Sequence, residues 1–175
     1  SVPEHVAQLP ADRFFPGGPR QVQHREGPFI GYRFHDTAAV PARFAFGHGL
    51  SYTTFEWSEV KLADEGPNPS VHVTVTNSGE RRGTDVVQIY VRRLDSALSR
   101  PDKELVAFAK VSLEPGESAA LVIDLEPRAF ENWDIGTHDW ATEGGDVEIL
   151  VARSSVDVAA TLHHHVDASG ALAPG

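Results

Sequence analysis

Valine alternates with a polar residue in the stretch Val71-His72-Val73-Thr74-Val75-Thr76. Because successive side chains of a strand point to opposite faces of a sheet, the three valines would share one face. This pattern is typical of a strand that packs one face on a core and turns the other toward solvent. The stretch therefore predicts a protein built on half-buried β-strands.

The same period of two recurs along the chain on both sides of this stretch. Turn-forming residues separate the alternating segments, as in Glu65-Gly66-Pro67-Asn68-Pro69 and Glu114-Pro115-Gly116-Glu117. We predict strands around residues 54–62, 71–76, 87–91, 105–113, 121–125, 147–151 and 156–162. We also expect one helical turn at 128–133. Short strands at this spacing indicate an all-β, antiparallel β-sandwich of the immunoglobulin or fibronectin type III kind, and the lack of cysteine argues against a true immunoglobulin domain.

The first 50 residues differ from the rest in composition. They contain six of the 12 prolines and six of the nine phenylalanines, without a periodic pattern. They carry five basic and four acidic side chains, whereas residues 51–175 carry 10 basic and 21 acidic ones. We therefore predict an irregular N-terminal arm with aromatic anchors, and a boundary near residues 47–51.

Length and charge exclude several classes of function. The chain has 175 residues, fewer than the roughly 250 of a (β/α)8 barrel, so chemistry on that scaffold would lie outside it. Its net charge of −10 repels phosphate backbones and anionic lipid, so we expect neither a nucleic-acid nor a membrane partner. The lack of cysteine excludes thiol catalysis and zinc–thiolate sites, and the lack of methionine leads us to expect a piece of a longer polypeptide.

The boundary itself carries a motif, Phe44-Ala45-Phe46-Gly47-His48-Gly49-Leu50-Ser51-Tyr52-Thr53-Thr54-Phe55. It resembles the junction before the C-terminal fibronectin type III-like domain of family 3 glycoside hydrolases, the β-glucosidase and β-xylosidase group. The resemblance continues in order through Thr76-Asn77-Ser78-Gly79, residues 83–91, residues 100–105, Leu113-Glu114-Pro115-Gly116-Glu117 and Ser154-Ser155. Upstream, Phe15-Pro16-Gly17 and residues 25–33 resemble the segment that closes the family's α/β sandwich domain.

The resemblance implies a division of the chain and a task for it. Residues 1–46 would be the final segment of the α/β sandwich domain and an interdomain arm, residues 47–168 the fibronectin type III-like domain, and residues 169–175 a tail. The parent enzyme would hydrolyse terminal β-linked sugars by the retaining mechanism, with its aspartate nucleophile in a barrel. We expect this chain to hold no catalytic residue, metal or cofactor, and to stabilise the catalytic domains.

The junction is our candidate site. Gly47 and Gly49 allow a tight reversal, and the residues around them provide apolar area that the arm alone cannot bury. We expect the loop at residues 95–101 to approach the catalytic side. The residues predicted to pack against the catalytic domains are Tyr32, Arg33, Phe44, Phe46, Leu50, Tyr52 and Phe55.

Other clusters suggest a different chemistry. Trp57, Trp133 and Trp140 could form a flat platform for stacking on sugar rings, and this would make the chain an autonomous carbohydrate-binding module. Asp139, Glu143, Asp146 and Glu148 surround a glycine turn but lack a regular calcium spacing, so we expect a solvated acidic face. In His163-His164-His165, the outer two residues share a face and the middle one takes the apolar phase, and a pair is too few for a zinc site.

Overall fold

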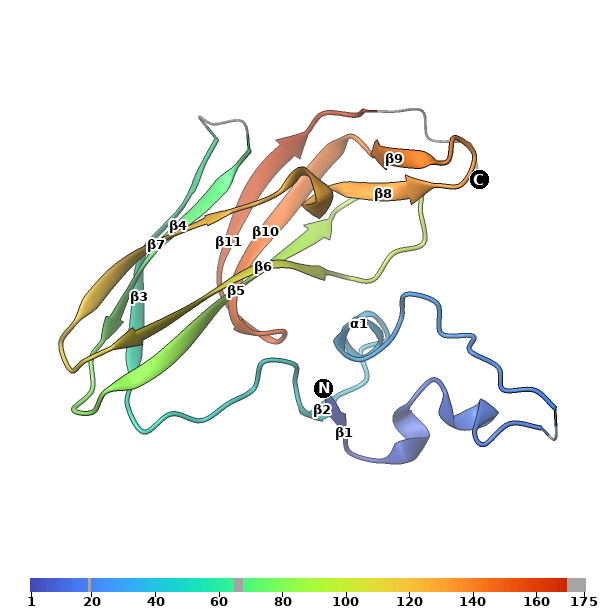
Figure 1. Cartoon of the computed structure of the whole chain (residues 1–175), viewed down its shortest axis with the longest axis horizontal. Coiled ribbons are helices and arrows are strands. Elements are labelled where there is room, and N and C mark those ends of the chain that lie inside the picture. Colours follow the sequence, from blue (N-terminus) through green and yellow to red (C-terminus); the bar gives the residue numbers. More distant parts are fainter. Residues whose placement is uncertain (19, 65–67, 170–175) are drawn as a thin grey trace.

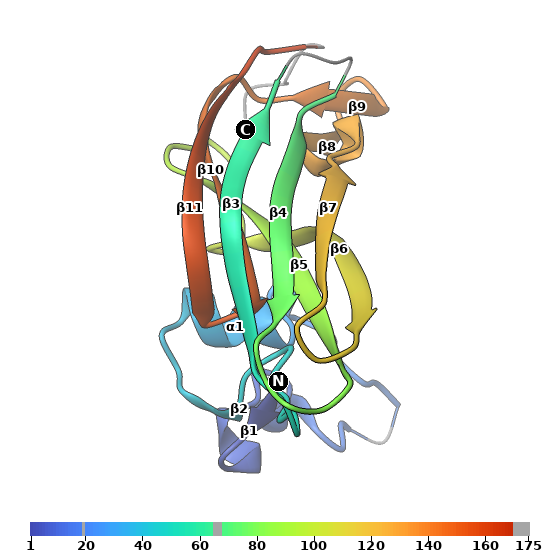
Figure 2. The same cartoon turned by 90° about the vertical axis from the view of Figure 1, so that its left-hand side faces the viewer.

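Two antiparallel sheets pack face to face in the computed structural model, which describes residues 1–18, 20–64 and 68–169 (Figure 1). The large sheet has the order β11 (Asp157–Val166), β10 (Gly145–Ser154), β5 (Gly83–Arg93) and β6 (Glu104–Leu113). The small sheet has the order β3 (Phe55–Ala63), β4 (Ser70–Asn77) and β7 (Ser118–Asp124), which Figure 2 shows side by side. These seven strands and the β-sandwich class confirm the prediction. Parts of the expected turn at 65–69 and of the tail at 169–175 lie outside the described residues.

The core lies between the sheets and follows the alternation of the sequence. In β4 the three valines of the opening stretch are buried, and the polar residues between them are only partly so. The same inward faces continue in both sheets. The fully buried side chains of this core include Val71, Val75, Val87, Ile89, Leu125, Val147, Ile149 and Val151.

Asn77 joins the two sheets at one end of the sandwich. Its side chain is fully buried and donates to the carbonyl oxygens of Arg81 (2.7 Å) and Leu113 (3.0 Å). Its Oδ1 accepts from the Thr53 hydroxyl (2.7 Å) and the Gly79 amide (3.1 Å). Every hydrogen-bonding group of this amide is therefore satisfied, which is what allows it to be buried.

The large sheet is buried on its second face as well. Tyr90 and Leu150 are paired across β5 and β10, point away from the small sheet, and are nevertheless fully buried with Ala152. The arm covers them, chiefly through α1 (Tyr32–Thr37). This explains why β5 and β10 carry near-continuous apolar runs, whereas β4 alternates.

Short elements complete the described chain. A two-stranded pair joins β1 (Val2–Pro3) to β2 (Ala42–Phe44) within the arm, and β8 (Glu131–Asp134) pairs with β9 (Asp139–Thr142) as a hairpin. Single-turn 3-10 helices occupy Val6–Gln8, Asp12–Phe14 and Pro127–Ala129. Among the described residues, no helix has the length and apolar character needed to cross a membrane.

The prediction of a helical turn over 128–133 was wrong in its extent. The turn comprises only Pro127–Ala129, and the chain enters β8 at Glu131. Trp133 lies opposite Trp140 in the hairpin register, so cross-strand pairing of these rings takes the place of a helical turn.

Candidate interdomain surface

Tyr32 links the arm to the large sheet. Its ring lies 5.2 Å from the ring of Phe46 and 5.6 Å from that of Tyr90. Its hydroxyl accepts the backbone N–H of Leu105 at 2.7 Å. Burial, with smaller contributions from Tyr32 and Asp36, raises the pKa of Tyr90 above the ordinary tyrosine value, so the ring stays neutral and donates to Gln88 Oε1.

The turn at Gly47 packs against the side chain of Gln88. Gly47 has a φ of +84°, and a Cβ there would lie 2.2 Å from Gln88 Nε2. Gln88 Nε2 donates to the carbonyl oxygen of Arg153 (3.0 Å), and Ser155 N–H donates to the carbonyl oxygen of Phe46 (2.8 Å). The junction is thus held at the end of β10 by one backbone hydrogen bond and by the packing of Gly47 on Gln88, which is itself bonded to β10.

Beyond this fixed turn, two side chains project almost entirely into solvent. Leu50 is 95% exposed and Tyr52 is 93% exposed. A hollow of about 460 Å³ separates this part of the junction from the β10–β11 turn, where Val156 is also exposed. The junction therefore presents uncovered apolar groups on a well-fixed backbone.

The other predicted packing residues differ in their surroundings. Phe46 is 39% exposed, and Phe44 lies against His48 with the two rings 5.2 Å apart. Arg33 forms an ion pair with Glu104 (3.2 Å). Phe55 packs against the core between the sheets, so it contributes less outward surface than the sequence suggested.

Charged groups hold α1 to the loop between β5 and β6, residues 94–103. Lys103 Nζ lies 3.0 Å from Asp36 Oδ2, and both side chains are less than a tenth exposed. The Asp102 N–H donates to the Thr37 hydroxyl at 2.8 Å. Arg92 in turn contacts Asp102 (2.9 Å) and Glu148. The C-terminal end of the loop is therefore attached to α1.

Glu143 orders the other end of the same loop. Its carboxylate accepts the Ser96 hydroxyl (2.6 Å) and the Ala97 N–H (2.7 Å), and it lies 3.6 Å from Arg100 Nε and 4.0 Å from Arg93 Nε. Burial alone would raise the pKa of Glu143, but these hydrogen bonds and the two guanidinium groups outweigh it and hold that pKa below its ordinary value. Sequence reasoning assigned this carboxylate to a solvated face, and the structure makes it a buried structural group.

The remaining carboxylates of that cluster have separate partners. Asp146 contacts His165 (2.6 Å), Glu148 contacts Arg92 (3.2 Å), and Asp139 is exposed. Across the described part of the chain, no group of three or more His, Asp or Glu side chains is placed to hold a metal ion.

The histidine stretch lies in β11 as its alternation predicted. His163 and His165 are exposed, and His164 is partly buried near Phe130, with ring centroids 5.6 Å apart. His164 also lies 3.4 Å from Asp64.

The three tryptophans do not form a flat platform. The Trp57 indole donates to Asp85 (2.7 Å) and is covered by Arg153, with the guanidinium carbon 4.4 Å from the ring centroid. Trp133 and Trp140 meet at an interplanar angle of 77°. The three rings therefore do not provide the coplanar stacking surface that the alternative of a carbohydrate-binding module requires.

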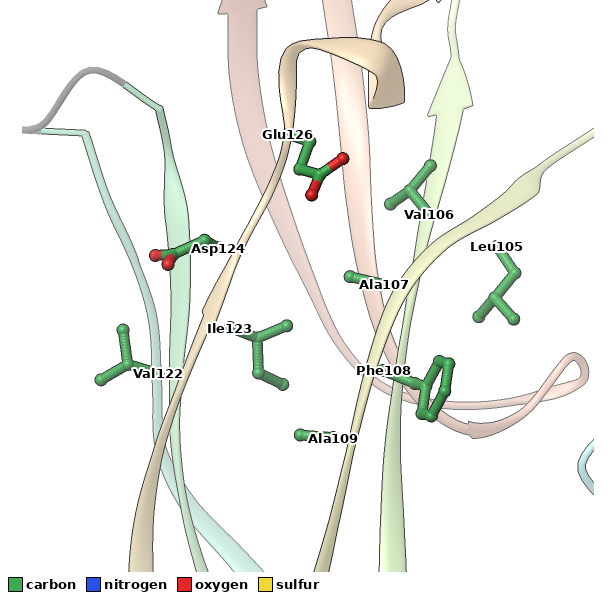
Figure 3. A pocket seen from close by; sticks show the side chains of 9 residues that line it. All are labelled: Leu105, Val106, Ala107, Phe108, Ala109, Val122, Ile123, Asp124 and Glu126. Atoms are coloured by element: carbon green, nitrogen blue, oxygen red, sulfur yellow. The ribbon is translucent and has the colours of Figure 1, made fainter.

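A groove of about 500 Å³ runs between β6 and β7, which are edge strands of their sheets. Figure 3 shows Ala107, Ala109 and Ile123 facing into the space between the strands, with Phe108 and Val122 directed to opposite sides of it. The described residues that line the groove include none of those predicted for interdomain packing.

Comparisons with known proteins agree with this architecture. Residues 85–155 match the family described as Fibronectin type III-like domain. The chain is 40% identical over 162 residues to the thermostable beta-glucosidase B of Acetivibrio thermocellus, covering 90% of this chain and 22% of that protein. It is 38% identical over 175 residues to an exo-alpha-(1->6)-L-arabinopyranosidase of Bifidobacterium breve, covering 99% of this chain and 23% of that protein.

Solved structures give the same result. The crystal structure of a GH3 beta-glucosidase from Bifidobacterium adolescentis superposes with a TM-score of 0.92 at 38% identity, covering 98% of this chain and 26% of that chain. The fold and the junction thus define a fibronectin type III-like domain with an attached arm. The chain corresponds to the C-terminal region of family 3 glycoside hydrolases, as the sequence motifs implied, and spans about a fifth to a quarter of the relatives it matches.

Proposed function

We propose that this chain is the non-catalytic C-terminal portion of a β-glucosidase-like glycoside hydrolase and that it stabilises the catalytic domains of that enzyme. The observation that carries the proposal is the near-complete exposure of Leu50 and Tyr52 on a junction that is fixed to the sandwich. Fully burying one large apolar side chain contributes about 1.5–3 kcal/mol. A protein neighbour at this junction would recover that free energy.

The fixed geometry of the junction supports a protein neighbour. The Phe46 carbonyl accepts the Ser155 N–H and the Thr53 hydroxyl donates to Asn77, so the backbone is anchored to the sandwich on both sides of Leu50 and Tyr52. Ordering a contact segment before it binds lowers the entropic cost of the contact. Exposed apolar groups on an ordered segment are characteristic of interaction surfaces.

The reaction would belong to the rest of the enzyme. Retaining glycosidases use two carboxyl groups roughly 5 Å apart, one as nucleophile and one as acid and base. The relatives extend over four to five times the length that this chain aligns with. One of them is named a beta-glucosidase and the other an arabinopyranosidase, although both share this portion with the chain. This supports the proposal that other parts of the enzyme determine which sugar is bound.

We further propose the division of the chain at the junction. Residues 1–46 would complete the α/β sandwich domain and form the interdomain arm, residues 47–168 would be the fibronectin type III-like domain, and residues 169–175 a tail. The reversal at Gly47, three residues after the end of β2, supports this boundary. The contact of Asp102 with Thr37 supports a position of the loop at 95–101 on the arm's side.

The alternative, an autonomous carbohydrate-binding module, has less support. A sugar-stacking platform needs open aromatic faces in one plane, and Trp133 and Trp140 are nearly perpendicular. Retention of the chain on insoluble polysaccharide would favour this alternative.

Removal of this chain from the parent polypeptide tests the proposal. We expect the isolated chain to hydrolyse no aryl β-glucoside, and the truncated parent to lose activity on heating sooner than the complete one. The measurement is the half-life of activity at raised temperature for both forms. A truncated parent as durable as the complete one, or turnover by the isolated chain that disappears when one of its own acids is replaced, would contradict the proposal.

A further inference from the structure

The β8–β9 hairpin carries an apolar surface separate from the junction, here called the hairpin patch and formed by Trp133, Ile135 and Trp140. Ile135, at the tip, is 80% exposed, and the two indoles are 49% and 42% exposed. The opposite side of the hairpin is closed, because Ala141 and Asp134 are buried. The hairpin thus turns one face to the protein and its tryptophan face outward.

Hydrogen bonds order the tip of the hairpin that bears the patch. Asp134 accepts hydrogen bonds from the Gly136 N–H (2.8 Å) and the Thr137 hydroxyl (3.1 Å), which fix the tip that bears Ile135. The Trp133 and Trp140 rings lie 5.5 Å apart in edge contact. The hairpin patch therefore sits on a fixed tip, and Ile135 and about half of each indole remain open to solvent among the described residues.

The ring geometry favours a protein over a sugar as the cover. The Arg128 guanidinium lies 3.7 Å from the centroid of Trp140 and occupies one face of that ring. Trp133 stands at 77° to it, and Ile135 has no ring at all. Sugar stacking requires open ring faces, whereas a mixed aromatic and aliphatic centre with a charged rim, here Arg128 and Glu131, is the composition of a protein interface.

The hairpin that bears the patch is linked to the arm through the β5–β6 loop. Arg100 in the β5–β6 loop donates to Asn132 Oδ1 in β8 (2.8 Å), and the same loop contacts Thr37 of α1 (2.8 Å). A hollow of about 300 Å³ lies between α1 and the base of the hairpin, lined by Arg33 and Arg128 among others. Figure 1 shows the hairpin, the loop and α1 in succession along the right-hand side.

From this placement we infer that the hairpin patch is a second interdomain contact, covered by an apolar surface of the same parent polypeptide that covers Leu50 and Tyr52. The inference rests on the proposed function and extends it, since the sandwich would then contact the rest of the enzyme at two points, the junction and the hairpin. Two contacts joined through a loop that Glu143 orders would fix the orientation of the sandwich as well as its position.

Hydroxyl-radical footprinting of the isolated chain and of the complete parent tests the inference. The oxidation rates of Trp133, Ile135 and Trp140 are compared between the two, with Tyr52 reporting the junction. Phe108, 66% exposed beside the β6–β7 groove, serves as the control that lies on neither contact. We expect the hairpin residues and Tyr52 to be oxidised several-fold more slowly in the parent, with Phe108 unchanged.

The other outcomes are separable. Protection of Tyr52 without protection of Trp133 and Ile135 would overturn the inference and leave the proposed function intact, whereas loss of protection at Tyr52 would contradict the proposed function itself. Slow oxidation of Trp133 already in the isolated chain would show that the chain covers its own hairpin. If a soluble β-glucan slows the oxidation of Trp133 in the isolated chain but not that of Ile135, the hairpin would be assigned to carbohydrate binding instead.

Discussion

Gly47 shows how one residue sets the position of the junction. The sequence predicts a tight reversal from Gly47 and Gly49, but only Gly47 has a positive φ and a close neighbour. The neighbour, Gln88, is 41 positions away in the chain, and no local pattern could have identified it. The requirement for glycine therefore comes from tertiary contact as much as from the turn.

Replacing Gly47 with alanine should destabilise the chain. A left-handed backbone costs an L-residue roughly 1–2 kcal/mol, and the new Cβ would also displace the Gln88 amide. We expect the free energy of unfolding in urea to fall by at least about that amount. Gly49→Ala is the matched control, because no atom lies within 4 Å of a Cβ there, and equal losses in the two variants would contradict this account.

At the scale of elements, alternation predicted the seven sandwich strands because each presents one face to the core. The same reasoning missed that β5 and β10 are buried on both faces, although their apolar runs at residues 89–91 and 149–152 were a signal for it. It also missed α1, since a six-residue helix is too short for a periodic pattern and is marginal by itself in water. Tertiary contacts with Lys103 and Tyr90 stabilise it.

These contacts correct one expectation about the arm. The sequence predicted an irregular N-terminal arm. The part from Tyr32 onward is instead bonded to the sheet and to the β5–β6 loop.

Lys103→Met should release α1. Removing one partner of a buried ion pair leaves the other charge uncompensated, at a cost of roughly 3–5 kcal/mol. We expect amide hydrogen exchange across α1 to accelerate strongly in this variant. The double change Lys103→Met with Asp36→Leu should recover most of the protection, and Arg82→Met, at an exposed pair with Glu114, should have little effect. Unchanged exchange in Lys103→Met would show that the pair does not hold the helix.

The β5–β6 loop should open in acid because of Glu143. The folded-state pKa of Glu143 lies below its ordinary value of 4.5, so the stabilisation is present above that value and is lost as the pH falls through the folded pKa. We expect exchange of the Ala97 amide, corrected for its intrinsic pH dependence, to rise in that range. In Glu143→Gln it should be fast and insensitive to pH, while Asp139→Asn, at an exposed site, should resemble the unaltered chain. A pH response that persists in Glu143→Gln would assign the effect to another group.

The whole molecule has two unlike outer faces. The small sheet presents hydroxyl groups, such as Thr74 bonded to Glu59 and Thr76 bonded to Ser118, directly to solvent. The large sheet presents Tyr90 and Leu150, which the arm covers. Contacts with other domains are therefore expected on the arm side, which includes the junction.

The most direct test of interdomain support compares thermal midpoints in two settings. Phe46 cannot separate the two settings, because its ring packs on Tyr32 within the chain. Its truncation would therefore lower the thermal midpoint of the isolated chain as well. Leu50 and Tyr52 have almost no contacts to lose, so the double variant Leu50→Ser, Tyr52→Ser should leave the midpoint of the isolated chain unchanged. In the complete parent it should lower the midpoint, since each buried side chain contributes about 1.5–3 kcal/mol to the contact. An unchanged midpoint in the parent, or an equal loss in both settings, would contradict the claim that this chain stabilises the catalytic domains through its junction.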